Sequence, residues 1–293
     1  MASDGIAFFD SGIGGLTVLN ECIKRLPSEV FYYYGDNAHA PYGNLPTKQI
    51  RRYVLSAFAR LEKCEVKAAV IACNTATAVC AEELRNKYPF PIIGAEPAVL
   101  PAAKDGGEIY ILCTRATYNS QRLRDLCARA ESIYPYSHLR PIACDALAGA
   151  IEENITQRDF RFEMILPKGA PSAVVLGCTH YIYIKERIEK FYGCKAYDGN
   201  AGMANRLCNL LENQAFSQNL EKNRDERPPT VHKEDFNGKT GVKFEKITNT
   251  NERSGKWRLQ NAGIPLNVRG ARIYFLGKNR KKNREIFKQM FVF

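Results

Sequence analysis

The sequence AAVIACNT at residues 68–75 has a counterpart, AVVLGCTH, at residues 173–180. In each, an apolar run typical of a buried strand leads directly to a cysteine, with a hydroxyl residue close behind it. The offset of 105 residues places Cys73 over Cys178. The apolar run at 6–9, followed by Asp10, likewise matches the run at 109–113, followed by Thr114, at an offset of 104 residues. Two nearly equal offsets indicate an internal duplication.

Outside these runs, short apolar stretches alternate with longer segments of helical periodicity. We expect strands at 6–9, 30–34, 68–72, 91–94, 109–113, 138–143 and 173–176, and helices at 16–26, 47–63, 74–87, 116–130, 145–154 and 183–191. Such alternation predicts a parallel sheet covered on both faces. Together with the duplication, it predicts an α/β fold with two similar parallel-sheet lobes related by a pseudo-two-fold axis. The active site is then expected in the cleft between the lobes, at the carboxyl ends of the strands.

The domain organisation follows from the same pattern. We expect a first lobe formed by residues 1–97 and 208–293, and a second lobe formed by residues 98–207. Residues 217–262 are polar and rich in turn signals, which predicts a flexible loop within an insertion of about 217–270. A strand at 271–276 and a helix at 281–291 follow it.

Composition limits the class of protein. The chain has 293 residues, of which 45% are hydrophobic and 25% charged, so it can bury a sizeable core. Its ten cysteines form no C-x-x-C pair and no zinc-ribbon spacing, so we expect neither a disulfide framework nor a metal. No apolar run reaches the roughly 18–20 residues of a membrane span. The N-terminal residues show no secretion signal, which favours the cytoplasm.

Most of the net charge of +11 lies near the C-terminus. Residues 217–293 hold 18 Lys and Arg against 8 Asp and Glu, and residues 1–216 hold 24 against 23. We interpret this basic segment as a solvated appendage, although charge asymmetry also occurs in proteins that bind nucleic acid.

Cys73 and Cys178 are the strongest candidates for chemistry. Each is expected at the N-terminus of a helix, where the helix dipole lowers the pKa of a thiol. In two symmetry-related lobes, the two thiols would face each other across the cleft. One thiolate could then take a proton from one face of a carbon while the other thiol returns a proton to the opposite face. This arrangement inverts a stereocentre without a cofactor.

The glycine-rich turn Asp10-Ser11-Gly12-Ile13-Gly14-Gly15 follows the first strand. It lacks both the dinucleotide pattern G-x-G-x-x-G and the Gly-Lys-Ser/Thr of a phosphate-binding loop. Its glycines allow close backbone approach, and a helix N-terminus at this point could hold a carboxylate. His180 lies two residues after Cys178, so it could share a proton with a group in the cleft.

Five motifs in order, within about residues 5–210, resemble those of the glutamate racemases in the aspartate/glutamate racemase superfamily. They are Asp10-Ser11-Gly12-Ile13-Gly14-Gly15, Gly35-Asp36 with Pro41-Tyr42-Gly43, Cys73-Asn74-Thr75-Ala76, Glu96-Pro97 and Gly177-Cys178-Thr179-His180-Tyr181. The resemblance implies cofactor-independent racemisation of L- and D-glutamate, which supplies D-glutamate for peptidoglycan precursors.

The resemblance also implies a role for particular residues. Cys73 and Cys178 match the two acid/base thiols. The residues matching those that assist the thiols are Asp10, His180 and Glu152. The residues matching the substrate contacts are Ser11, Tyr42, Gly43, Asn74, Thr75, Thr114, Thr117 and Thr179. A homodimer is the expected assembly.

Two other functions stay open at this point. The first is another amino-acid racemase of the superfamily, acting on aspartate. The second is a regulator that binds nucleic acid or protein through its basic segment and has weak racemase activity. The presence of both thiols argues against an inactive enzyme.

Overall fold

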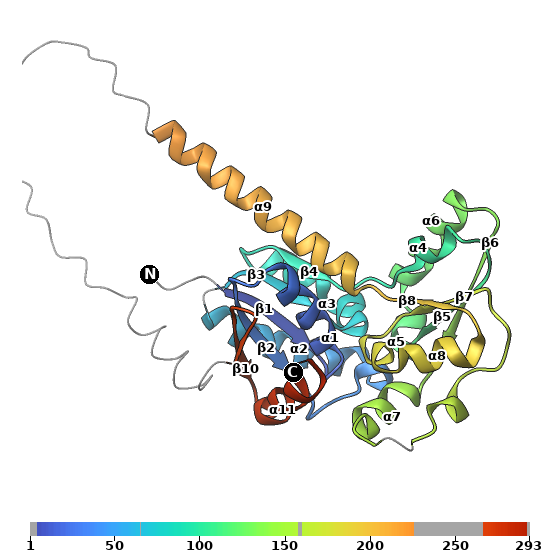
Figure 1. Ribbon diagram of the computed structural model, residues 1–293. Helices are drawn as coiled ribbons and strands as arrows, with labels where there is room; N and C mark the ends of the chain where they lie inside the picture. The colour runs from blue at the N-terminus through green and yellow to red at the C-terminus, as the bar shows by residue number, and fades with distance from the viewer. Residues whose placement is uncertain (1–4, 65, 158–159, 226–265, 292–293) are drawn as a thin grey trace, which may run out of the picture.

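The computed structural model describes residues 5–64, 66–157, 160–225 and 266–291, and these form two lobes that each contain one sheet (Figure 1). The first sheet has six strands in the order β4-β3-β1-β2-β10-β9. Their bounds are Ile92–Gly94, Val66–Ile71, Gly5–Asp10, Val30–Gly35, Ala271–Leu276 and Leu266–Val268. All neighbours are parallel except β9, which pairs antiparallel with β10.

The second sheet has four parallel strands in the order β6-β5-β7-β8. Their bounds are Ser137–Ala143, Gly107–Cys113, Ala173–Leu176 and Lys195–Tyr197. Read from the other edge, the order β8-β7-β5-β6 repeats the order β4-β3-β1-β2 of the first sheet. The predicted α/β fold with two similar parallel-sheet lobes is therefore confirmed.

Backbone hydrogen bonds at the strand ends align the two halves. Ala72 N donates to Phe9 O (2.8 Å), and Gly177 N donates to Leu112 O (2.7 Å). The offset is thus 105 residues for β3 and β7, as predicted, but 103 residues for β1 and β5. The predicted offset of 104 is wrong by one residue, so that Ser11, and not Asp10, is the counterpart of Thr114.

The first sheet is covered on both faces because its strand residues alternate between two apolar clusters. Phe8 belongs to the cluster that includes residues of α1 (Gly15–Arg25), α9 (Asn200–Asp225) and α11 (Arg280–Phe291). Phe9 belongs to the cluster that includes residues of α2 (Thr47–Leu61) and α3 (Asn74–Lys87). In the second lobe, α7 (Leu147–Asn154) and α8 (Lys185–Tyr192) contribute to one cluster, and α4 (Val99–Ala103) and α6 (Gln121–Ile133) to the other.

The chain passes between the lobes twice, once between β4 and α4 and once between β8 and α9. At these crossings Gly199 lies against the backbone of Glu96, because a Cβ on Gly199 would lie 2.6 Å from Glu96 O. The domain boundaries predicted near residues 97 and 207 stay predictions. The second boundary falls inside α9, which packs against α1 of the first lobe.

Three predicted elements differ from the structure. The helix expected at 116–130 is two helices, α5 (Arg115–Tyr118) and α6, because Ser120 interrupts it and caps α6 by accepting a hydrogen bond from Leu123 N (3.2 Å). The helix expected at 145–154 begins only at Leu147. The helix expected at 183–191 is α8, and it is preceded by the 3-10 helix η4 (Thr179–Ile184).

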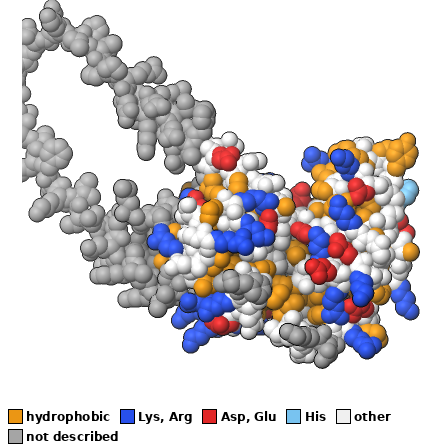
Figure 2. Space-filling view, in the orientation of Figure 1, with side chains coloured by type: hydrophobic (Ala, Val, Ile, Leu, Met, Phe, Trp, Pro, Cys, Tyr) orange, Lys and Arg blue, Asp and Glu red, His pale blue; other side chains and the backbone are white. Residues whose placement is uncertain are grey.

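The predicted loop at 217–262 is wrong for its first nine residues, because α9 continues to Asp225. The rest of that prediction lies outside the described residues. The helices α4 and α9 and the strands β8 and β9 are additional elements that the sequence patterns did not predict. Among the described residues, no helix is both long and apolar enough to cross a membrane. Figure 2 shows charges of both signs interspersed over one face of the two lobes.

We expect Phe287→Ala to lower the free energy of unfolding by about 3–5 kcal/mol, since it removes a large buried ring. Phe287 is fully buried and packs 6.0 Å, centroid to centroid, from Phe275 of β10. Urea denaturation followed by circular dichroism measures the change. Gln289→Ala, on the exposed side of the same helix, is the control and should change stability by less than about 0.5 kcal/mol. A decrease in the free energy of unfolding of less than about 1 kcal/mol for Phe287→Ala would show that α11 does not pack in the apolar core of the first lobe.

Candidate active site

The two predicted thiols lie at equivalent positions of the two lobes. Cys73 follows β3 after Ala72, and Cys178 follows β7 after Gly177. Both side chains are buried, with 6% and 8% of their surface exposed. Both cysteines lie near the contact between the lobes, where Asp10 of the first lobe accepts a hydrogen bond from Thr179 of the second.

Cys73 caps α3 with its sulfur. Sγ accepts a hydrogen bond from Ala76 N (3.4 Å) and lies 3.5 Å from the hydroxyl of Ser11. Burial, together with the nearby Asp10, raises the pKa of Cys73 to about 12. The hydrogen bond from Ala76 N at the helix terminus lowers this pKa, but burial and Asp10 outweigh it, so the predicted net lowering is wrong. A helix dipole contributes about 1 kcal/mol, and removing a thiolate from water costs more.

Cys178 is not at the start of an α-helix, as the sequence had suggested, but at the start of the 3-10 helix η4. Its Sγ lies 3.7 Å from Nδ1 of His180, and Nε2 of the same imidazole lies 2.7 Å from Oε2 of Glu152. Burial disfavours the charged imidazole, but the hydrogen bonds to Cys178 and Glu152 outweigh it and raise the pKa of His180. These three side chains form a continuous hydrogen-bonded relay.

Glu152, on α7 of the second lobe, reaches into the first lobe. Its Oε2 accepts a hydrogen bond from Ile13 N (3.0 Å), and its Oε1 accepts one from Asn37 Nδ2 (2.5 Å) and lies 3.5 Å from Lys282 Nζ. Burial alone would favour the neutral acid. The hydrogen bonds from His180, Ile13 and Asn37 outweigh burial and lower the pKa of Glu152 to about 2.

Asp10 is fully buried at the end of β1. One of its oxygens accepts a hydrogen bond from Gly12 N (2.9 Å), and the other accepts one from the hydroxyl of Thr179 (3.4 Å) across the lobe interface. Burial raises its pKa, against the opposing effect of His180. Asp10, whose charge acts on Cys73, thus also hydrogen-bonds to the residue that follows Cys178.

Two glycines of the first-strand turn allow the lobes to approach this closely. A Cβ on Gly12 would lie 2.4 Å from Oε2 of Glu152, and a Cβ on Gly14 would lie 2.4 Å from Oγ1 of Thr179. Real Cβ atoms do not approach other atoms to such distances. The turn predicted to bind a carboxylate therefore also serves as the contact surface for the second lobe.

A second group of polar residues joins the lobes. The hydroxyls of Thr75 and Thr114 are 2.8 Å apart, and Thr114 also donates to Thr117 (3.1 Å). Gly43 packs so closely on Thr114 that a Cβ would lie 2.7 Å from Thr114 Cβ. The backbone of Gly43 can therefore face this hydroxyl cluster directly.

Tyr42 and Asn74 lie beside these groups. The Tyr42 hydroxyl does not point to the thiols but donates to Asp36 (2.7 Å), so its ring is fixed and its phenol is occupied. Asn74 begins α3, directly after Cys73, and its Oδ1 is buried without a hydrogen-bond partner among the described residues. That oxygen is available to a bound ligand.

Four residues that hold this site were not predicted from the sequence. Tyr33 and Tyr183 donate to the carbonyls of Gly12 and Ile13, each at 2.8 Å, and so fix the turn. Asn37 and Lys282 approach the carboxylate of Glu152, as described above. Tyr33 lies in the apolar run at 30–34, and Tyr183 lies in the apolar and aromatic segment η4. These patterns predicted only that the two side chains are buried, and nothing in the sequence links the two tyrosines to the turn.

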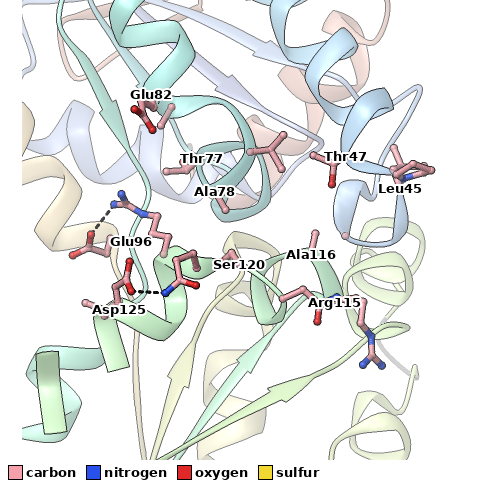
Figure 3. Close-up of a pocket in the computed structure, with 18 of the residues that line it drawn as sticks. Leu45, Thr47, Thr77, Ala78, Glu82, Glu96, Arg115, Ala116, Ser120 and Asp125 are labelled. Carbon is pink, nitrogen blue, oxygen red and sulfur yellow. Dashed lines mark hydrogen bonds and ion pairs between the residues drawn. The ribbon is translucent and has the colours of Figure 1, made fainter. Parts of the chain in front are cut away.

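Two cavities lie between the lobes. The larger, of about 980 Å³, lies between the first-lobe residues Leu45, Thr47 and Ala78 and the second-lobe helices α5 and α6 (Figure 3). The ion pair between Arg122 and Glu96 (2.7 Å) lines it, but neither thiol does. The smaller, of about 340 Å³, is lined by Asn37, Glu152 and Lys282, among others. Within the described ranges no group of three or more His, Cys, Asp or Glu could hold a metal ion.

Comparison with known proteins agrees with the motifs and the fold. The family model "Asp/Glu/Hydantoin racemase" matches residues 19–207. A glutamate racemase from Clostridium botulinum is 39% identical over 221 residues, which cover 71% of this chain and 84% of that protein. One from Clostridium perfringens is 37% identical over 231 residues, covering 75% and 88%.

Solved structures give the same result. Escherichia coli glutamate racemase, crystallised with L-glutamate and an activator, superposes with a TM-score of 0.65 at 31% identity, over 72% of this chain and 83% of that one. The Francisella tularensis enzyme, crystallised with D-glutamate, gives a TM-score of 0.62 at 28% identity, over 73% and 83%. These likenesses, on a fold whose two lobes bring the paired thiols together, show that the chain belongs to the Asp/Glu/Hydantoin racemase family.

Proposed function

We propose that this chain is a glutamate racemase, an isomerase that interconverts L- and D-glutamate without a cofactor. The observation that carries the proposal is the pair of buried thiols, Cys73 and Cys178, at the carboxyl ends of equivalent strands of the two lobes. In each direction one thiolate removes the Cα proton from one face, and the opposite thiol delivers a proton to the other face.

The surrounding groups suit a substrate with two carboxylates and one ammonium. We infer that hydroxyl and amide groups bind the carboxylates, as neutral donors do in other buried anion sites. They belong to Ser11, Asn74, Thr75, Thr114, Thr117 and Thr179, with the backbone N–H groups of Tyr42 and Gly43. The glutamate bound in the structures of the two relatives supports this choice of substrate.

The two thiols receive different help. Asp10 lies beside Cys73, and its buried carboxylate suits a group that accepts or stabilises a proton of the substrate ammonium or of the thiol. His180, held by Glu152, can take the proton of Cys178 or return it. The weakly acidic Cα–H requires such assistance, because a carbanion is unstable unless it forms in a desolvated, polar site.

The proposal includes a physiological role, namely the supply of D-glutamate for peptidoglycan precursors, which follows from membership of the family. A homodimer and a cytoplasmic location stay predictions. So does the interpretation of the basic segment, residues 217–293, as a solvated appendage and not a nucleic-acid contact, since residues 226–265 lie outside the described residues.

We expect circular dichroism of L-glutamate and of D-glutamate to decay to zero on addition of the purified protein alone. Cys73→Ala and Cys178→Ala should each slow racemisation in both directions by at least about 10²–10⁴-fold, since each enantiomer needs one thiolate and one thiol. Cys127→Ala, a partly buried thiol on α6, is the matched control and should keep normal turnover.

Two outcomes would contradict this assignment. Near-normal turnover in either single active-site variant would exclude the two-thiol mechanism. Racemisation of aspartate in preference to glutamate by the unchanged protein would exclude the proposed substrate.

A second prediction concerns the charge of Asp10. Asp10→Asn removes the negative charge that helps to raise the pKa of Cys73. The pKa of Cys73 therefore falls, and a larger fraction of this thiol is ionised at pH 8.5. We therefore expect iodoacetamide to alkylate Cys73 about three- to tenfold faster at pH 8.5, as measured by peptide mass spectrometry. Cys80 serves as the internal control, because burial and Glu83, not Asp10, raise its pKa. Equal alkylation of Cys73 in both proteins would show that Asp10 does not act on this thiol.

A further inference from the structure

We propose that Asn37 is a positioning residue of the reaction. Its amide, on the first lobe, holds the Glu152 carboxylate of the second lobe and thereby controls the protonation of the His180–Cys178 pair. This inference rests on the proposed function. It adds to that function a residue that contacts neither thiol.

The hydrogen bonds of Glu152 show why Asn37 matters. A carboxylate accepts about four hydrogen bonds, and four donors surround this one. His180 and the Ile13 amide share Oε2, while Asn37 (2.5 Å) and Lys282 (3.5 Å) share Oε1. Lys282 is half exposed, so water screens its charge. Asn37 is therefore the principal side-chain donor to Oε1.

The orientation of the Asn37 amide follows from Glu152 alone. Its Oδ1 is buried and has no hydrogen-bond partner among the described residues. Rotating the amide by 180° would place Oδ1 against the carboxylate and leave Nδ2 unpartnered instead. The cost of that rotation keeps Nδ2 directed at Glu152.

Glu152 in turn fixes the role of each imidazole nitrogen. Its ionised carboxylate only accepts hydrogen bonds, so Nε2 of His180 must carry a proton and donate it. Nδ1 then faces the sulfur of Cys178 (3.7 Å), where it can take the thiol proton. A firmly ionised Glu152 stabilises the imidazolium, and the imidazolium stabilises the thiolate.

The donors and the relay belong to different lobes. Asn37, Ile13 and Lys282 are in the first lobe, whereas Glu152 and the His180–Cys178 pair are in the second. The relay therefore has its full set of donors only while the two lobes are together. Asn37 therefore connects the contact between the lobes to the protonation of the His180–Cys178 pair.

Other titratable groups also face this relay. Asp10, Tyr33 and Tyr183 interact electrostatically with Glu152, and Asp10 also interacts with His180. Neither these groups nor Lys282 is altered by a substitution at position 37. A change in pH dependence on mutating Asn37 is therefore attributable to the lost amide.

The test compares Asn37→Ala with Asn44→Ala. Asn44 also donates a hydrogen bond between the lobes, to Asp145 O (3.0 Å), but it is exposed and its hydrogen bond goes to a backbone carbonyl outside the relay. Loss of the Asn37 donor raises the pKa of Glu152 and lowers that of His180, so the thiolate–imidazolium pair is less favoured. We expect kcat to fall about tenfold in Asn37→Ala with KM changed less than about twofold. The acid limb of kcat should move to higher pH in the direction that uses Cys178 as the base.

A second variant and a second readout complete the test. Asn37→Asp is nearly isosteric but adds a negative charge beside Glu152, which favours the imidazolium, so it should move the limb in the opposite direction, to lower pH. NMR titration of His180, one of four histidines, measures the effect without turnover and should show a lower pKa in Asn37→Ala and a higher one in Asn37→Asp.

The outcomes separate this inference from the proposed function. An unchanged His180 titration and an unchanged pH profile in folded Asn37→Ala and Asn37→Asp would overturn the role of Asn37. An equal shift in Asn44→Ala would do the same, because it would reflect interface loss in general. If the unaltered protein does not racemise glutamate, the proposed function fails, while the NMR comparison still decides whether Asn37 acts on His180.

Discussion

Glu152 is a buried carboxylate that belongs to one lobe and takes hydrogen bonds from the backbone and side chains of the other. Leaving such a charge without partners in a dry interior costs several kcal/mol, so the lobe interface must supply them. This need for hydrogen-bond donors explains three features of the site. They are the turn that contains Gly12, the two tyrosines that hydrogen-bond to it, and the relay from Glu152 to Cys178. The turn lacks a Cβ where Glu152 arrives, and its carbonyls are fixed so that an N–H faces the carboxylate.

Much of the fold follows from the sequence because the apolar period and the duplication are strong, local signals. Strands such as β7 (Ala173–Leu176) and the helix α3 have the predicted limits. The failures occur where a single side chain overrides periodicity. Ser120 divides one apparent helix by capping the next, and the segment after Cys178 adopts a 3-10 helix. The one-residue error in the offset arose because apolar runs do not reveal which backbone groups pair at a strand end.

In the site, too, some features could be predicted from the sequence and others could not. Motifs located the cysteines and the hydroxyl residues, since these lie at strand ends and helix starts. The pKa of Cys73 was predicted in the wrong direction, because a helix terminus is visible in sequence whereas burial between two lobes is not. Asn37 and Lys282 were missed because their partner, Glu152, is more than 100 residues away in the chain.

The position of β10 between β2 and β9 has a consequence for how the molecule is made. The ribosome completes β2 at Gly35 and the whole second lobe before it reaches Ala271, the start of β10. At about 5–20 residues per second, the aromatic edge of β2 lacks its native neighbour for at least about 10 seconds. Unpaired strand edges of this kind promote aggregation. The nascent chain therefore passes through a stage at which its first lobe is a target for chaperones.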